Sequence, residues 1–283
     1  MKKILLSLLS IGAVAVVAVA ATGAFFSDTE TSQDNTFVAG ELDLQVDNEC
    51  HYNGELCVDP DDDGPLTLAW SLTDLENGVH KFFHFTDIKP GDFGEDTVSL
   101  HVFNNDAWGR FVISNVEDLE NVCNDAEVTA GDVSCTVTNG DGELRENLLF
   151  MVWLDEGLVS GFQCPDETPE CNEDVNEGDN ELDDGELVLI TEGTVDLEGE
   201  IHNIWQGLAA VYAANSCQGD GSELSDCPGL TSDGHMVGSI TYYFGIGWEL
   251  PETVGNEVQT DSLVADMIFE VEQYRNNPIP FGP

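Results

Sequence analysis

The sequence is short of positive charge. It contains 7 Lys and Arg residues against 56 Asp and Glu residues, a formal net charge of -49 over 283 residues. A protein with so much negative charge repels phosphate groups. The composition therefore excludes functions that require binding to nucleic acids or anionic membranes. Hydrophobic residues nevertheless make up 41% of the chain, which is enough apolar material for a folded core and unlike a disordered acidic tail.

The sequence patterns of common hydrolases are also missing. There is no H-E-x-x-H zinc motif, no G-x-S-x-G nucleophile motif and no C-x-x-C pair. His80 and His84 come nearest to a metal-binding pair, but the residues around them favour a strand, in which positions four apart are separated by about 13 Å. We therefore expect a protein that is not an enzyme and has no catalytic residues.

The beginning of the chain has the pattern of a secretory signal peptide. Lys2 and Lys3 precede an uncharged apolar run that extends to Ala21 and is followed by small residues. This order predicts a signal peptide over residues 1–24, removed by a signal peptidase before Phe25. A run of about 18 apolar residues nearly spans a bilayer, so a retained anchor is the alternative. After cleavage we expect a secreted, extracellular chain without membrane association.

The eight cysteines of an exported chain indicate disulfides rather than free thiols. They fall into four close sequence pairs, and we expect each pair to bridge a short loop. Zinc binding is the alternative, but the gaps match no zinc-finger spacing. The expected bridges are Cys50–Cys57, Cys123–Cys135, Cys164–Cys171 and Cys217–Cys227.

Hydrophobic and polar residues mostly alternate, which is the period of a half-buried strand. The clearest example is residues 239–248, in which Ile240, Tyr242, Phe244, Ile246 and Trp248 share one face. The other expected strands are residues 41–46, 97–103, 111–116, 148–154, 186–190 and 267–273.

The remaining segments predict one short helix and several long loops. The helix is expected over residues 203–215, the only good helix candidate after the signal. The acidic, cysteine-containing stretches are expected to be disulfide-stapled loops, at residues 47–65, 117–146, 164–185 and 215–235. Many strands with little helix predict an all-β protein, a jelly-roll-like antiparallel β-sandwich over residues 37–283.

The excess of acid has two compatible interpretations, adaptation to a salty medium and binding of divalent cations. Asp59, Asp61 and Asp63, followed by Gly64, have the spacing that opens a calcium loop. Position 12 is Trp70 and not the bidentate Glu of an EF-hand, so an ordinary acidic turn is the alternative. A second acidic cluster with weaker spacing consists of Asp174, Asn176, Asp179, Asp183 and Asp184.

Near the predicted cleavage site the sequence reads F-F-S-D-T-E at residues 25–30 and T-F-V-A-G-E-L-D-L at residues 36–44. These motifs resemble those of the TasA/camelysin family of secreted proteins. The turn D-I-K-P-G-D at residues 87–92 is similar to the L-K-P-G-D turn of the family, and G-N-E-V-Q-T-D-S at residues 255–262 fits its archaeal and environmental members. Residues 106–237 do not share this resemblance.

The resemblance implies a jelly-roll subunit that assembles with copies of itself into extracellular fibres. In that picture a donor arm, residues 25–36, is freed by cleavage and adds as a strand to the next subunit. Phe25 and Phe26 with Ser27 and Asp28 would form its tip; the alternative is that the two rings fold back onto their own sandwich. Two other functions stay open, a secreted metallopeptidase like that assigned to camelysin-type relatives, and a monomeric calcium-binding adhesive module.

Overall fold

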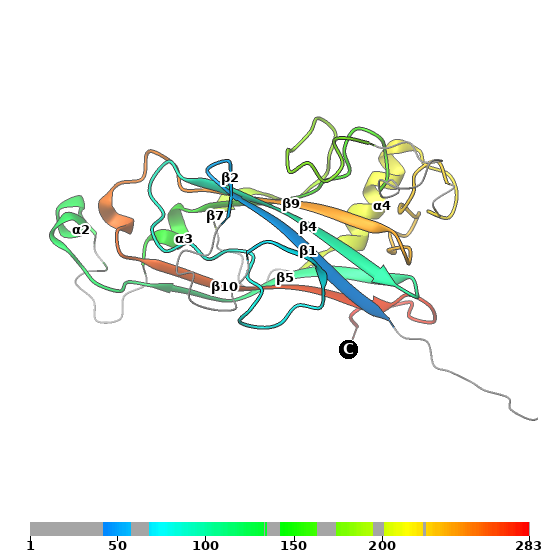
Figure 1. Cartoon of the computed structure of the whole chain (residues 1–283), viewed down its shortest axis with the longest axis horizontal. Coiled ribbons are helices and arrows are strands. Elements are labelled where there is room, and N and C mark those ends of the chain that lie inside the picture. The colour runs from blue at the N-terminus through cyan, green and yellow to red at the C-terminus, as the bar shows by residue number, and fades with distance from the viewer. Residues whose placement is uncertain are drawn as a thin grey trace, which may run out of the picture. The chain divides into compact units, whose positions relative to one another are not determined.

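Strands with one apolar face build two antiparallel sheets (Figure 1). The computed structural model describes residues 42–57, 68–132, 134, 142–162, 174–194, 201–222 and 225–282. The larger sheet has the strand order β2-β1-β4-β9-β6-β7, with β3 paired to β1, and the smaller has the order β10-β5-β8. Several neighbouring strands, such as β4 beside β9 and β5 beside β10, come from distant parts of the chain, as in a jelly roll.

The strands of the larger sheet are β1 (Asp43–Tyr52), β2 (Glu55–Leu56), β3 (Trp70–Thr73), β4 (Phe93–Phe103), β6 (Leu149–Leu154), β7 (Val188–Thr194) and β9 (Thr241–Glu249). Those of the smaller sheet are β5 (Ala107–Leu119), β8 (Ile201–Asn203) and β10 (Ser262–Gln273). These elements confirm the predicted all-β sandwich.

The core lies between the two sheets. On β9, Tyr242, Phe244 and Ile246 are almost completely buried, which confirms the face predicted from the alternation. The ring of Phe244 lies 6.0 Å from that of Phe269 on β10, which in turn lies 5.0 Å from Phe111 on β5. Contacts between the two sheets therefore bury the apolar faces that neither sheet could shield alone.

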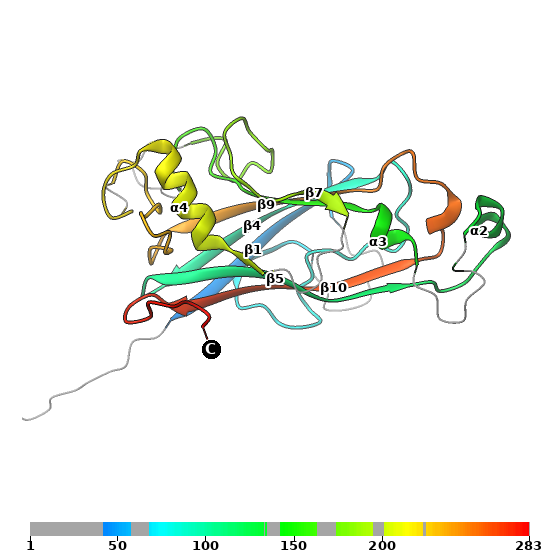
Figure 2. The same cartoon turned by 180° about the vertical axis from the view of Figure 1, so that it is seen from behind.

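The predicted helix is present as α4 (Ile204–Asn215). Ile204, Leu208 and Val211 form its buried face, at the spacing of an amphipathic helix. The stretch 117–146 is not a continuous loop, however, because it contains α2 (Asp125–Ala130) and α3 (Leu144–Asn147). A short 3-10 helix, η2 (Asn256–Val258), follows β9. The two views place α4 and α2 at opposite ends of the sheets (Figure 2).

The predicted loop at residues 47–65 is also corrected. β1 continues to Tyr52 and turns through Asn53 and Gly54, both with positive φ, into β2. This Asn-Gly turn closes a two-residue hairpin, because both positions need the left-handed conformation that these residues tolerate best. Local turn chemistry therefore extends the sheet into a segment whose acidity suggested a loop.

Two of the four predicted disulfides are confirmed, Cys50–Cys57 and Cys217–Cys227. The first staples the β1–β2 hairpin, and the second follows α4. Cys123 is also disulfide-bonded. Its expected partner Cys135, and Cys164 and Cys171, lie outside the described residues. Disulfides indicate an oxidising, extracellular environment.

Residues Gly40–Pro283 form one compact unit. The predicted signal peptide and donor arm, residues 1–36, lie outside the described residues, as do Phe25, Phe26, Ser27 and Asp28. No helix in the described part of the chain is long and apolar enough to cross a membrane.

Gly245 of β9 is required by the close approach of Trp153 of β6. A Cβ atom at this position would lie 1.9 Å from the Trp153 indole, whereas one at Gly193 of β7 would meet only a backbone oxygen at 3.6 Å. We expect Gly245→Ala to lower the free energy of unfolding by about 1–3 kcal/mol through overpacking. Urea unfolding followed by tryptophan fluorescence measures this change.

Gly193→Ala is the matched control and is expected to leave stability nearly unchanged. Equal midpoints for the two variants would show that the indole does not press on the sheet at Gly245.

Candidate functional site

Carboxylates from three separate segments meet where β5 ends. Glu120 follows the last residue of β5, Asp132 follows α2, and Glu143 precedes α3. The helix α2 is fixed by a capping box, in which the Asn124 side chain accepts from the Glu127 amide and the Glu127 carboxylate accepts from the Asn124 amide. Glu127 is fully buried, and its second oxygen accepts from the Thr260 hydroxyl.

We call Glu120, Asp132 and Glu143 the carboxylate triad. One carboxylate oxygen of each lies within 4.8 Å of the others, a separation that a single hard cation with oxygen ligands at about 2.3–2.6 Å can bridge. The Ser134 hydroxyl lies 2.9 Å from Glu120, 2.7 Å from Asp132 and 3.4 Å from Glu143. A hydroxyl has one proton, so it satisfies one of these oxygens at a time.

Burial and the charges of neighbouring acids raise the pKa of two members of the triad, Glu143 and Glu120. Burial, followed by the charge of Asp132, raises the pKa of Glu143 to about 7. Burial also raises the pKa of Glu120 and that of the neighbouring Asp261, whose carboxylate accepts from the Glu143 amide. The triad can therefore be stabilised in two ways, by protons or by a bound cation.

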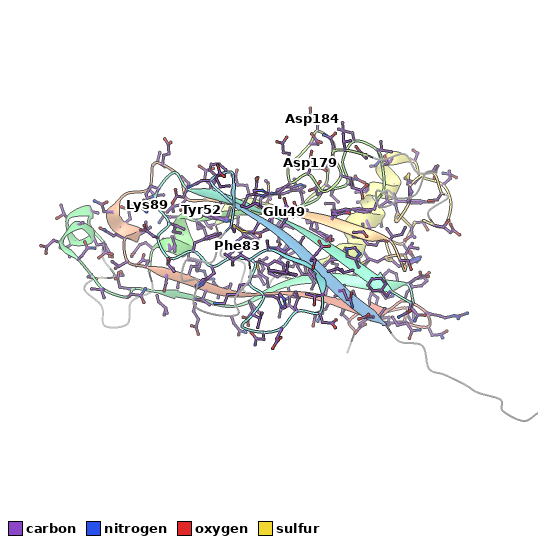
Figure 3. All side chains as sticks on the ribbon, viewed as in Figure 1. Glu49, Tyr52, Phe83, Lys89, Asp179 and Asp184 are labelled. Atoms are coloured by element: carbon purple, nitrogen blue, oxygen red, sulfur yellow. A yellow bond between two sulfur atoms is a disulfide. The ribbon has the colours of Figure 1, made fainter. Side chains whose placement is uncertain are left out.

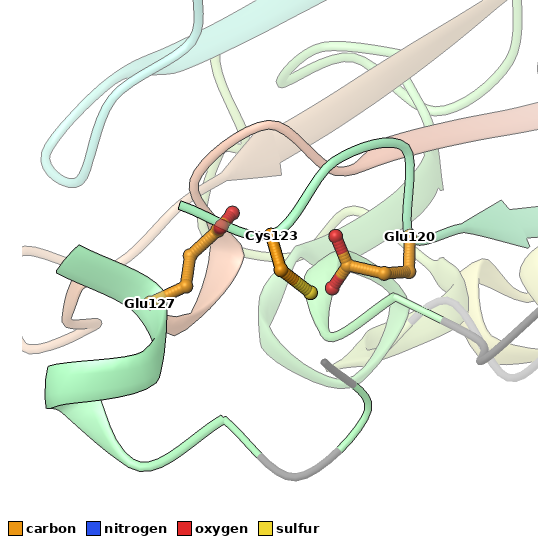
Figure 4. Close-up of side chains that lie close together, drawn as sticks. All are labelled: Glu120, Cys123 and Glu127. Carbon is orange, nitrogen blue, oxygen red and sulfur yellow. The ribbon is translucent and has the colours of Figure 1, made fainter. Parts of the chain in front are cut away.

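Cys123 lies between the carboxylates of Glu120 and Glu127 (Figure 4). A thiolate there would complete a second three-ligand group. Its sulfur is engaged in a disulfide, however, and a disulfide sulfur carries no thiolate charge for a metal. The carboxylate triad is thus the better candidate for a cation.

A second set of buried carboxylates follows β6. Asp155 is fully buried and accepts from the amides of Gly178 and Asn180, at 2.9 and 3.1 Å. Glu156 is 4% exposed and accepts from the Gly161 amide. Burial raises the pKa of Asp155 and that of Glu156 to about 7. These acids hold the loop before β7 in place through backbone N–H groups.

The predicted acidic cluster at residues 174–184 belongs to the same loop (Figure 3). Asp174 accepts from the Val159 amide, Asp179 from the Glu181 amide, and Asp183 from the Asn176 side chain. Within the described residues, three converging acidic or cysteine ligands occur only around Glu120. The cluster therefore acts as turn-forming acceptors and does not gather three carboxylates. The other predicted calcium ligands, Asp59, Asp61 and Asp63, lie outside the described residues.

A serine, a histidine and an aspartate also meet on the outer face of β1 and β4. Nε2 of His101 lies 3.0 Å from the Ser99 hydroxyl and 3.4 Å from Asp47, while Nδ1 faces Thr241 at 3.1 Å. In a catalytic triad the serine and the carboxylate contact opposite ring nitrogens. Here they share one nitrogen, and Ser99 is 1% exposed, so the group is a structural polar network.

The carboxylate triad was missed by sequence reasoning. Its members are about a dozen positions apart in a stretch interpreted as a loop, and no short motif links them. The one local signal was Asn124 with Glu127, the spacing of a capping box, which would have predicted α2. The helix α2 brings the triad residues together only because it packs against η2. No local sequence pattern predicts that contact.

The raised pKa values predict how stability varies with pH. The folded protein binds protons on Glu143 more tightly than the unfolded chain, so stability is lost as pH rises from the ordinary value of 4.5 to about 7. We expect Glu143→Gln to unfold at a higher temperature than the unchanged protein at about pH 8, with a smaller gain at about pH 5. Calorimetry in chelator at both pH values measures the difference.

Glu76→Gln removes the same charge from an exposed position and serves as control. A pH profile for Glu143→Gln that parallels both the control and the unchanged protein would contradict the raised pKa of Glu143.

No protein-family model matches the chain, and comparison with curated proteins gives no match. The resemblance to the TasA/camelysin family therefore depends on the motifs at residues 25–30, 36–44, 87–92 and 255–262.

Proposed function

We propose that the chain is a secreted structural subunit that polymerises into filaments of the cell surface or biofilm matrix. The donor arm, residues 25–36, would add as a strand to the next copy. A contact of this kind joins the arm of one copy to a different surface of the next copy. Assembly therefore continues head to tail and does not close into a ring. The protein is proposed to have no enzymatic activity.

The observation that carries this proposal is that two strands at sheet edges, β7 and β10, each have one unpaired side. In the described part of the chain, β10 pairs only with β5, and β7 pairs only with β6. The strand β10 is 12 residues long, and Val264 and Ile268 on it are 54% and 37% exposed. Unpaired backbone groups along an edge accept another strand readily, and this is the surface that donor-strand addition uses.

The charge of the chain sets a condition on assembly. Mature copies lack Lys2 and Lys3 and keep 56 acidic residues against 5 basic ones, a formal net charge of -51, so they repel one another. Salt or bound cations must reduce this repulsion before the copies can associate. Calcium is the proposed cation because the carboxylate triad offers only oxygen ligands, which suit a hard ion.

The two alternative functions predict different behaviour. A secreted metallopeptidase requires zinc-dependent proteolysis that a chelator abolishes. Among the described residues, no histidine belongs to a converging group of three ligands, so no observation favours this function. A monomeric calcium-binding adhesive module would gain stability from cations without forming a polymer.

Negative-stain electron microscopy tests the proposal on protein that begins at Phe25. We expect fibres from this mature chain and none from protein that begins at Phe37, because the second lacks the donor arm. A mature chain with Phe25→Ser and Phe26→Ser keeps the arm length and tests the aromatic tip. Monomers of the mature chain at every salt and calcium concentration would overturn the proposed function.

Light scattering tests the dependence on ions. We expect mature protein to polymerise faster in high salt or calcium than in low salt with chelator, because both reduce the repulsion between copies. Magnesium at the same ionic strength separates screening from calcium binding. Growth that is equally fast in low-salt chelator would show that repulsion does not limit assembly.

A further inference from the structure

A pocket of about 390 Å³ lies on the outer face of the larger sheet. The strands β4, β9 and β6 run side by side there, with Glu95 opposite Gly247, and Gly247 opposite Met151. These positions alternate with the core-facing ones and point away from the smaller sheet. Asn180 and Glu192, from the loop before β7 and from β7 itself, line the same pocket.

Two residues that line the pocket, Trp153 and Asn180, have buried polar side-chain atoms without a hydrogen-bond partner among the described residues. Trp153 is 3% exposed and lies close over Gly245, and its indole Nε1 finds no hydrogen-bond partner in the described part of the chain. Asn180 is 6% exposed, and neither its amide nitrogen nor its amide oxygen has a partner among the described residues. Buried donors and acceptors are costly when unpaired, so a ligand gains affinity if the Asn180 amide turns toward the pocket and pairs with it.

Asp155 holds Asn180 in this position. Its carboxylate accepts from the backbone amides of Gly178 and Asn180, which fixes the loop against the sheet. The Asn180 side chain is left free of that contact. The unpaired amide therefore belongs to an anchored part of the structure.

The rim of the pocket is negative and apolar. Four carboxylates line it, and none of the lining residues is a lysine or an arginine; they are Glu95, Glu181, Glu192 and Glu249. Burial raises the pKa of Glu95, and the negative charge of Glu181 raises it further. Phe93 and Leu182 lie among them and are 45% and 43% exposed.

These features define the ligand by its chemistry. The rim favours a cation, but its carboxylates do not converge on one point as a bare metal ion requires. The indole N–H and the amide N–H of Asn180 need an acceptor, and the amide oxygen needs a donor. A peptide amino terminus supplies an ammonium group beside a carbonyl oxygen, and an apolar first side chain would cover the exposed rings.

We propose that this pocket binds the free amino terminus of a peptide chain whose first residue is apolar, and that Phe25 of a second copy is its occupant. The second part rests on the proposed function, because cleavage must free Phe25. The 17 residues from Phe25 to Glu41 span at most roughly 60 Å when extended, so the terminus can reach a neighbouring molecule. An arm paired along the edge strand β7 would lie beside Glu192 and the pocket.

Calorimetry with the peptide F-F-S-D-T-E, which copies residues 25–30, tests the pocket directly. The protein is the mature chain with Phe25→Ser and Phe26→Ser, so that its own arm does not compete. The buffer contains chelator and about physiological salt, which screens the repulsion between the acidic protein and the peptide. We expect the free peptide to bind and the N-acetylated peptide to bind at least about tenfold more weakly, since acetylation removes the ammonium charge. Equal binding of the two peptides, or no binding by either, would overturn the proposal.

A double variant, Glu95→Gln with Glu181→Gln, locates the binding site. We expect it to reduce affinity for the free peptide at least about tenfold and to leave the acetylated peptide unaffected. Glu76→Gln with Glu117→Gln removes the same charge from exposed positions outside the pocket and should bind as before. Circular dichroism confirms that both variants are folded. If the control double variant also lost affinity for the free peptide, the effect would come from the net charge of the protein, and the assigned pocket would be wrong.

Fibre formation separates this inference from the proposed function. If the mature chain forms fibres and the Glu95→Gln, Glu181→Gln variant forms them at the same rate, the pocket assignment is wrong while the filament proposal stands. If the mature chain forms no fibres but the peptide binds through its free amine, the pocket assignment stands. Its natural occupant is then the amino terminus of another peptide and not Phe25 of a second copy.

Discussion

The scarcity of basic residues governs how this protein accommodates its carboxylates. Ion pairs such as Lys89–Asp87 and Arg110–Glu270 serve only a few acids. The buried ones instead accept from backbone N–H groups, as Asp155 does, or share a hydroxyl, as the carboxylate triad does. An amide dipole compensates a buried charge less fully than a cation does, so such acids hold protons to higher pH.

This use of carboxylates connects the loops to the two candidate sites. At one end of β5, the capping box of α2 and the Asp261 contact bring the triad together. After β6, Asp155 holds the loop that carries Asn180 over the outer face of the sheet. Each site therefore depends on acids whose own role is structural.

The parts of the fold that follow local rules could be predicted from the sequence. The alternation over residues 239–248 predicts which residues of β9 face the core, because successive side chains of a strand point to opposite sides. Short cysteine spacing gave Cys50–Cys57 and Cys217–Cys227. The Asn53-Gly54 hairpin also has a local signal, but it lies in an acidic, cysteine-containing stretch whose composition favours a loop.

The candidate sites could not be predicted in the same way. The pocket exists because pairing places Glu95, Gly247 and Met151 in one row, although they come from three distant strands. The triad exists because α2 and α3 turn two loops toward the end of β5. Register and packing between remote segments are set by the whole core, and a single sequence carries no separate signal for them.

Glu143, Asp155 and Glu156 each have a pKa of about 7. A molecule with such groups takes up protons near neutral pH, where ordinary aspartate and glutamate side chains are fully ionised. Packed at high density, molecules of this kind would act as a buffer, and mild acidification of their surroundings would be absorbed in part by the protein itself.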